Sequence, residues 1–298
     1  MSLKELRTRL KSIKSTSQIT KAMKLVSTAK FGKSLHQFHQ IKHFYTELQS
    51  LWNFLSSYPA IRQRMLQLEW VKPIEAPPLS IALFTNRGLC GGYNNSLSKI
   101  LPSTDQGPFV FLGKRGIASV QKNYGNYIKE SDLEDLSSQL LNSVSPYPIS
   151  PIYLSFAWEN PTFSTAQDFF GKISDLKKSF PFYSLNFIYN QFYSALSQVP
   201  KQETLIPLSL SEEISTDFAP LIDSDFLHSL SVDLIQSQLY FILMNAYTSE
   251  QGARMAAMDN ATRNAGEIQK RLQITYQRAR QSAITNELSE IISGAEAL

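Results

Sequence analysis

Proline is confined to the middle of this sequence. All fourteen prolines fall between Pro59 and Pro220, so the first 58 residues and the last 78 contain none. Proline removes a helical hydrogen bond and clashes with the preceding turn, whereas long stretches poor in both proline and glycine can form uninterrupted helices. The distribution predicts two long helices, at residues 1–58 and 221–298, around a proline-rich insert.

When Leu227 is taken as an a position of a heptad, none of the eighteen a and d positions of the C-terminal segment is charged. Such a pattern predicts a helix that contacts a partner along its length, and at about 1.5 Å per residue the rod is on the order of 100 Å long. Only eight of the eighteen a and d positions are Leu, Phe or Met, which favours a contact that adapts or slides. Counted from the first a position, these residues are Leu227, Leu230, Leu234, Ser237, Phe241, Met244, Thr248, Gln251, Met255, Met258, Thr262, Ala265, Gln269, Leu272, Tyr276, Ala279, Ala283 and Asn286.

The N-terminal segment is also amphipathic. A polar stretch at residues 14–18 separates two apolar sets, and we expect the apolar phase to shift there. The helix is predicted to end near Ser57, because Tyr58 precedes a proline, and to pair antiparallel with the C-terminal helix. The two apolar sets are Leu3, Leu6, Leu10 and Ile13 before the interruption, and Ile19, Met23 and Val26 after it.

The middle of the chain alternates short apolar runs with helix-like stretches. This alternation predicts an inserted Rossmann-like α/β domain at residues 74–210 with a partly parallel sheet, so the fold class is α/β with a long antiparallel coiled coil. The predicted strands are Leu79–Phe84, Phe109–Leu112, Ile152–Phe156 and Leu185–Tyr189, and the predicted helices are Gly116–Lys122, Leu133–Leu141 and Thr165–Leu176.

Composition excludes several classes of protein. With 43% hydrophobic and 18% charged residues the chain is typical of a folded globular protein, and no stretch approaches the roughly 18 apolar residues of a membrane-spanning helix. The single cysteine excludes an internal disulfide and fits a reducing compartment. The N-terminus enters the amphipathic pattern at once, so we expect no signal or transit segment in front of it; either the protein acts where it is made or the sequence is that of the mature form.

Positive charge is concentrated at the N-terminal end. Residues 1–33 contain nine Lys or Arg against the single Glu5, and Lys4, Arg7, Lys11 and Lys14 follow one helical face. Such a face suits nucleic acid, acidic lipid or an acidic protein. The segment lacks the interleaved aromatic residues of many nucleic-acid binders, so nucleic-acid binding remains an alternative.

Two glycine-containing segments superficially resemble phosphate-binding loops. Gly88–Gly92 follows a predicted strand, but its spacing is G-x-x-G-G where the dinucleotide fingerprint requires G-x-G-x-x-G, which favours a structural turn or a subunit-contact loop. Gly32–Ser34 reads Gly-Lys-Ser, but it lies within a predicted helix and Ser27 stands where the first glycine of a P-loop belongs. We expect no bound cofactor.

A few reactive side chains remain as weak candidates. His36, His39 and His43, with Glu47 one turn further, lie near one helical face and could hold zinc, although a solvated face is the simpler interpretation. Cys90 has no evident histidine partner for a nucleophilic role. We therefore expect neither a metal site nor a catalytic residue, and no enzymatic activity in the chain itself.

Four segments resemble F-type ATP synthase gamma subunits. They are Leu3–Arg7 with Ile19–Met23 and Ala29–Lys30, the loop Asn86–Asn94, the segment Ser249–Met255, and Arg280–Thr285 continuing to Ser293–Gly294. Asn86 stands where the family usually has Asp, residues 100–180 match poorly, and the cysteine pair of the plastid form is absent.

The resemblance implies the central stalk of a proton-translocating ATP synthase, which transmits torque and performs no bond chemistry itself. Its implied partners are the alpha and beta subunits of the catalytic hexamer, an epsilon or delta-type stalk subunit and the membrane c-ring, with no nucleic acid. The implied location is peripheral, on the cytoplasmic side of a bacterial inner membrane or the matrix side of the mitochondrial inner membrane. A coiled-coil protein whose basic helix binds nucleic acid is the alternative.

The resemblance also implies two sets of functional residues. Contacts with the hexamer that influence coupling are implied at Met23, Arg254, Gln281 and Thr285, with Arg280 and Glu287 as nearby polar candidates. A stalk-loop contact is implied at Arg87, Gly88, Leu89, Cys90 and Gly91. Each has a simpler interpretation: Met23 also suits a coiled-coil seam, and Arg254 also suits a solvated helix face.

Overall fold

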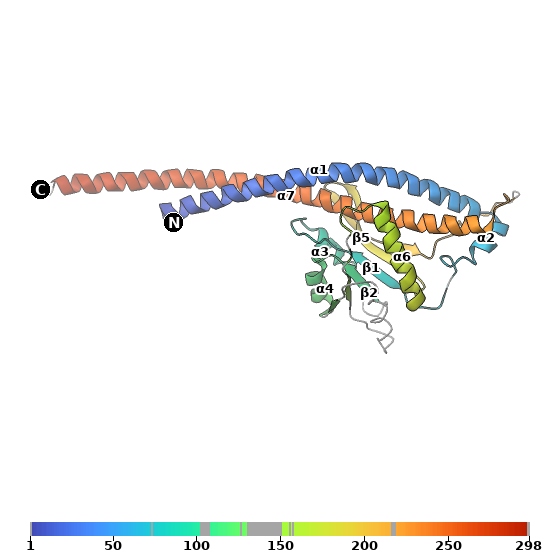
Figure 1. The fold of residues 1–298 in the computed structure, drawn as a ribbon. Coiled ribbons are helices and arrows are strands. Elements are labelled where there is room, and N and C mark those ends of the chain that lie inside the picture. The colour runs from blue at the N-terminus through green and yellow to red at the C-terminus, as the bar shows by residue number, and fades with distance from the viewer. Residues whose placement is uncertain are drawn as a thin grey trace.

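The fold is dominated by two antiparallel helices that lie side by side (Figure 1). The computed structural model describes residues 2–72, 74–101, 108–125, 127–129, 151–154, 156, 158–215 and 219–296. Helix α1 spans Leu3–Ser56 and helix α7 spans Ser224–Glu296. An α/β body sits beside one end of the pair, and at the other end α7 continues past the N-terminus of α1 (Figure 1).

Local sequence signals set both ends of α1. Ser2 and Glu5 form a capping box, in which the Ser2 hydroxyl accepts from the Glu5 N–H at 3.2 Å and the Glu5 carboxylate accepts from the Ser2 N–H at 2.9 Å. After Ser56 the chain turns into the short helix α2, Pro59–Met65, which begins with the proline. The predicted stop before Pro59 is therefore confirmed.

The buried face of α1 follows one uninterrupted heptad, so the predicted shift of phase is wrong. Small hydroxyl residues occupy the seam where apolar residues were expected, and apolar Ile19, Leu25 and Val26 are exposed. A hydroxyl can sit in a seam at little cost when it bonds to its own helix, as Thr20 does to the Ser17 carbonyl oxygen. The buried and half-buried seam residues are Leu3, Leu6, Leu10, Ile13, Ser17, Thr20, Lys24, Ser27, Phe31, Ser34, Phe38, Ile41, Tyr45, Leu48, Trp52 and Leu55.

Helix α7 changes its environment along its length. Residues 242–254 are buried without interruption, because α7 there lies between α1 and the sheet. Beyond Ala265 only a stripe is shielded, and it includes Leu272, Tyr276 and Ala283 as the heptad predicted. Asn286 is exposed, so the predicted contact along the whole stripe does not extend to its last position.

The body contains a six-stranded sheet in the order β3-β4-β2-β1-β5-β6, which confirms the α/β fold class. All neighbouring strands are parallel except β5 and β6, which form an antiparallel hairpin. The strands are β1 Leu79–Leu83, β2 Phe109–Leu112, β3 Ile128–Lys129, β4 Ile152–Leu154, β5 Leu185–Ser194 and β6 Ser197–Ile206.

Helices cover both faces of the sheet. Alternate residues of β1 show the division: Ile81 and Leu83 join the core beneath α6 (Phe163–Ser179) and α7, whereas Ala82 packs on the opposite side. That opposite side is covered by α3, Tyr93–Leu97, and α4, Gly116–Tyr124. A parallel sheet covered on both faces explains why its strands are nearly continuous apolar runs.

Most predicted elements are found, with instructive exceptions. The strand predicted at Phe109–Leu112 is confirmed at both ends, while the one predicted from Ile152 ends at Leu154. Strand β6 was not predicted, because it is polar and contains Pro200, which an edge strand tolerates. The predicted helix Leu133–Leu141 lies outside the described residues.

Trp52 anchors the C-terminal end of α1 in the core. Its side chain is 1% exposed and its indole N–H donates to the Ser209 carbonyl oxygen at 2.9 Å. Trp52→Ala should lower the free energy of unfolding by about 3–5 kcal/mol, measured by urea unfolding. Phe44→Ala, at an exposed aromatic on the same helix, is the control; equal losses in both variants would contradict this anchoring role.

Candidate functional site

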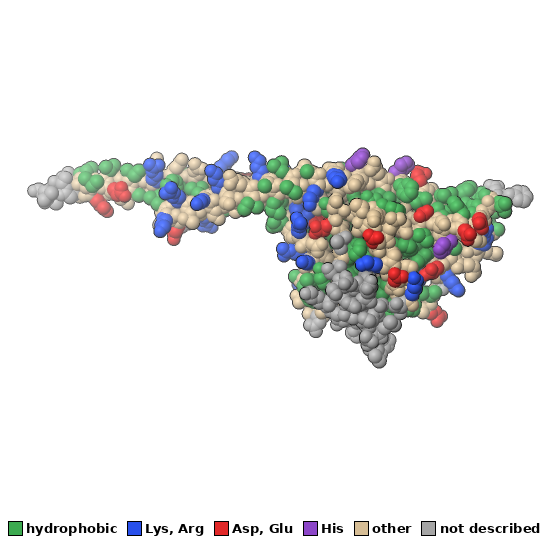
Figure 2. Space-filling model, in the orientation of Figure 1, with side chains coloured by type: hydrophobic (Ala, Val, Ile, Leu, Met, Phe, Trp, Pro, Cys, Tyr) green, Lys and Arg blue, Asp and Glu red, His purple; other side chains and the backbone are tan. Residues whose placement is uncertain are grey.

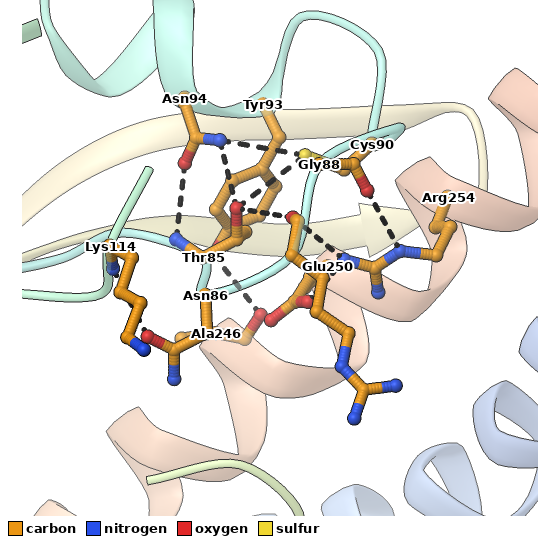
Figure 3. A network of polar contacts seen from close by, with 11 residues as sticks. Thr85, Asn86, Gly88, Cys90, Tyr93, Asn94, Lys114, Ala246, Glu250 and Arg254 are labelled. Atoms are coloured by element: carbon orange, nitrogen blue, oxygen red, sulfur yellow. Dashed lines mark hydrogen bonds and ion pairs between the residues drawn. The ribbon is translucent and has the colours of Figure 1, made fainter. Parts of the chain in front are cut away.

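The glycine-containing loop after β1 lies against α7 (Figure 3). Two residues of the loop have positive φ, Leu89 at 65° and Gly91 at 60°. Asn94 holds the base of the loop: its amide oxygen accepts from the Thr85 N–H at 3.1 Å and its amide nitrogen donates to the Thr85 hydroxyl at 2.8 Å. The loop therefore has a defined shape before any partner binds.

Arg254 of α7 binds this loop from the helix side. Its guanidinium donates to the carbonyl oxygens of Arg87 at 3.2 Å and Gly88 at 3.4 Å, and to the Glu250 carboxylate at 2.5 Å (Figure 3). The side chains of Arg254 and Glu250 are 7% and 2% exposed. Arg254 is thus a buried structural cation, and the interpretation as a solvated charge is wrong.

Glu250 is only partly satisfied by this arrangement. One carboxylate oxygen accepts from Arg254, while the other is buried without a hydrogen-bond partner among the described residues. Burial raises the pKa of the Glu250 carboxyl above its usual value, against the opposing effect of the Arg254 guanidinium. A buried carboxylate oxygen without a hydrogen-bond partner costs free energy of folding.

A groove of about 380 Å³ opens beside this pair. Both helices and two loops of the body contribute to it, and its charged side chains have both signs. On α1 its wall is apolar at Ala22, Met23 and Val26, with Ser27 and Lys30 beside them. The lining residues are Ala22, Met23, Val26, Ser27, Lys30, Arg87, Glu159, Asn160, Tyr247, Glu250, Gln251 and Arg254.

The geometry of the glycine loop does not suit phosphate binding. Phosphate loops direct backbone N–H groups toward the ligand, whereas this loop directs two carbonyl oxygens toward Arg254. Cys90 is buried, and burial raises the pKa of its thiol, which disfavours the thiolate that a nucleophile requires. The loop serves as a shaped turn held against α7.

The residues implied by resemblance fall into two groups. Met23, Arg254 and the Arg87–Gly91 loop meet where the pair of α1 and α7 leaves the body. We call the helix pair the shaft and this level of it the neck. Arg280, Gln281, Thr285 and Glu287 are exposed on the protruding end of α7, roughly 40–50 Å beyond Arg254 along the helix at 1.5 Å per residue.

Several lining residues were not singled out from the sequence. Lys30, Glu159, Tyr247 and Glu250 lie in the groove although no motif marked them. The spacing of Glu250 and Arg254, i and i+4 on a helix, was a usable signal. Its weakness is that such pairs are common on solvated helices.

The histidine cluster is exposed on the outer face of α1. His43 lies 3.6 Å from Glu47, and His36 and His39 are exposed as well. Within the described ranges, no group of three or more His, Cys, Asp or Glu side chains is placed to hold a metal ion. In the same part of the chain, no helix is long and apolar enough to cross a membrane.

A two-helix shaft with an inserted α/β body and a charged neck defines a structural class of rod-like subunits, and comparison with known proteins identifies the family. The family model described as ATP synthase matches residues 2–298. The gamma chains of Dinoroseobacter shibae and Pelagibacter ubique are 33% and 31% identical, each over 99% of this chain and 99% of the relative. The chain therefore belongs to the ATP synthase gamma-chain family.

Solved structures share the fold. A chain in the structure of Euglena gracilis mitochondrial ATP synthase, OSCP/F1/c-ring, superposes with a TM-score of 0.65 at 17% identity, covering 99% of this chain and 94% of that one. A chain from the rotor of the same enzyme gives a TM-score of 0.60 at 16% identity, covering 95% and 98%. At these identities the likeness concerns the fold.

Glu250 should make stability depend on pH in a definite direction. The pKa of Glu250 in the folded chain is raised above its ordinary value of 4.5. As the pH rises from 4.5 to the folded-state pKa, the folded chain therefore retains a proton that the unfolded chain releases. The free energy of unfolding therefore falls as pH rises there. Glu250→Gln abolishes this titration, so its stability relative to the original chain should increase from about pH 4.5 upward.

Urea unfolding at a series of pH values measures this difference. Glu267→Gln, at an exposed glutamate on the same helix, controls for the loss of one negative charge. A relative stability of Glu250→Gln that stays constant or falls with pH would contradict the prediction.

Proposed function

We propose that this chain is the rotating central stalk of a proton-translocating ATP synthase, transmitting torque between the membrane rotor ring and the catalytic hexamer without performing bond chemistry itself. Family membership and the shaft geometry support this proposal. The catalytic residues then belong to the hexamer. The chain acts by presenting different sides to different catalytic subunits, which biases each among its conformations.

The observation that carries the proposal is the inverted polarity of α1 at the neck. Over residues 17–34 most seam positions hold Ser, Thr or Lys, whereas apolar Ile19, Leu25 and Val26 point outward. A helix with its polar residues inside and apolar residues outside gains little from its own pairing. Exposed apolar residues of this kind favour a partner that covers them.

The neck groove supplies the polar part of the same contact. We propose that Met23 and Arg254 transmit torque to a beta subunit here, with the Arg87–Gly91 loop as the adjoining stalk contact. Arg254 does so by holding the loop in place, since its own guanidinium is buried. Glu250 keeps the Arg254 guanidinium in this position through the carboxylate oxygen that accepts its hydrogen bond.

The protruding end of α7 forms a second contact with the hexamer. After Arg280 the sequence contains no Lys or Arg, and the apolar residues Ile284, Leu288, Ile291 and Ile292 are exposed at helical spacing. We propose that Arg280, Gln281, Thr285 and Glu287 lie at the entrance of the hexamer. The basic side chains that Figure 2 shows along the shaft would face acidic surfaces of the alpha and beta subunits.

The opposite end of the molecule, at the turn from α1 into α2, would face the c-ring and an epsilon or delta-type stalk subunit. We accordingly divide the chain into residues 1–58, 74–210 and 221–298, two rod helices and an α/β domain between them. The proposed location is peripheral, on the cytoplasmic side of a bacterial inner membrane or, in a mitochondrion, on the matrix side.

Co-purification tests the function directly. Recovery of the chain with a large multisubunit ATPase supports the proposal. Salt-sensitive retention on DNA without such partners would support the alternative of a nucleic-acid-binding coiled coil.

Arg254→Ala should impair ATP-driven proton pumping more than assembly of the complex. The substitution releases the loop carbonyls of Arg87 and Gly88 and leaves the Glu250 carboxyl unpaired. Pumping by inverted vesicles, compared with the amount of chain recovered in the complex, measures the effect. Full pumping in this variant would count against the neck contact.

Ile291→Ser with Ile292→Ser tests the tip. These side chains are 67% and 57% exposed, so the unfolding of the isolated chain should not change. If the hexamer buries both side chains, its affinity for the chain should fall at least about tenfold. Binding of the purified chain to a reconstituted hexamer measures this loss, with Leu196→Ser in the β5–β6 turn as control; unchanged affinity of the tip variant would exclude the contact.

A further inference from the structure

Lys24 is the one charged residue among the sixteen seam positions of α1. It occupies a first position of the heptad, in the stretch where the seam is polar. The eighteen corresponding positions of α7 are free of charge, so Lys24 is exceptional for the whole pair. A Lys at such a position weakens a coiled coil, but it can specify the register of the two helices.

Lys24 is paired across the seam with Asp259 of α7. The Lys24 Nζ lies 2.5 Å from the Asp259 Oδ1, and the two side chains are 40% and 34% exposed. The other carboxylate oxygen lies 3.3 Å from Arg263 on the same helix. These contacts bring one carboxylate between two cations, one from each helix.

A second polar contact joins the helices one turn away. The hydroxyls of Thr262 and Thr20 lie 2.9 Å apart, and the Thr262 hydroxyl also lies 2.7 Å from the Met258 carbonyl oxygen of its own helix. Thr20 and Thr262 are both seam positions. Thr20 lies four residues before Lys24 on α1, and Thr262 lies three residues after Asp259 on α7. Two contacts at successive turns of both helices fix an axial position better than either alone.

This pairing is possible in only one register. A slide of one heptad in either direction would bring Gly252 or Gly266 to the place of Asp259, and neither has a side chain that can pair with Lys24. Lys24 would then lie at the seam without its partner. The seam residue next to Lys24 on the side of the body, Ser27, is small and provides no large side chain to resist such a slide, and Phe31 is the first large seam residue after it.

We propose that Lys24, Asp259, Thr20 and Thr262 form a register clasp, which fixes the axial position of α1 on α7 at the neck. The clasp makes the two helices move as one at the level where the pair leaves the body. Its role in transmitting torque depends on the proposed function, whereas its role in setting the register does not.

Distance measurement by double electron–electron resonance in the full chain tests the register. Spin labels at Thr8→Cys and Glu290→Cys, in a Cys90→Ser background, lie at different heights along the shaft, so an axial slide changes their separation directly. Lys24→Glu places two carboxylates together and should broaden or shift the distance distribution by about 5–10 Å, one helical turn to one heptad. Lys24→Glu with Asp259→Lys restores opposite charges and should restore the original distribution.

Arg263→Ala is the matched control, because it removes a pair of Asp259 that lies within one helix and should leave the distribution unchanged. An unchanged distribution in Lys24→Glu would overturn the clasp. Failure of the charge exchange to restore the original distribution would overturn it equally.

A second measurement in the assembled ATPase tests the role in transmission. Lys24→Glu should lower proton pumping per ATP hydrolysed by at least about threefold, and the charge exchange should recover it. Normal pumping together with a broadened distance distribution would overturn the transmission role. Failure of the unsubstituted chain to assemble into an ATPase would instead contradict the proposed function. The distance measurement would still decide whether the clasp sets the register.

Discussion

The uninterrupted burial of α7 over residues 242–254 is the constraint on which the rest of the structure depends. On one side the helix packs against α1, and on the other it packs against the sheet and the β5–β6 hairpin. Two hydrogen bonds also join α7 to the body: the Tyr93 hydroxyl donates to the Ala246 carbonyl oxygen, and the Asn245 side chain accepts from the Phe192 N–H. Because α7 is shared, the rod and the body are one mechanical unit.

The neck site is a consequence of where this burial ends. Arg254 is the last residue of the buried stretch, so its guanidinium is desolvated and its hydrogen bonds go to the β1 loop and Glu250. Past it, α7 is shielded only along its seam. The transition from body to free shaft therefore coincides with the groove, which puts the loop, the buried ion pair and the outward apolar residues of α1 at one level.

The sequence predicted the parts of the fold that depend on local rules. Proline-free ends and Tyr58-Pro59 predicted both long helices, and the run Phe109–Leu112 predicted its strand, because backbone chemistry and continuous apolar runs act locally. Strand β6 depends on pairing with β5, which its polar sequence does not reveal. At the neck, resemblance indicated the loop and Arg254, but burial of Glu250 is a tertiary effect, and its i, i+4 spacing to Arg254 does not distinguish it from pairs on solvated helices.

The error in the seam of α1 has a physical cause that joins the site to the clasp. Apolar side chains predict the buried face of a helix, yet at the neck Ile19 and Val26 point outward while Thr20 and Ser27 are buried. A helix that must offer an apolar surface to a partner loses that surface from its own seam. The remaining polar seam has little preference for one register, so charge and hydroxyl pairing at Lys24 and Thr20 must supply it. The apolar seams on either side hold the helices together, and the polar contacts between them determine where they meet.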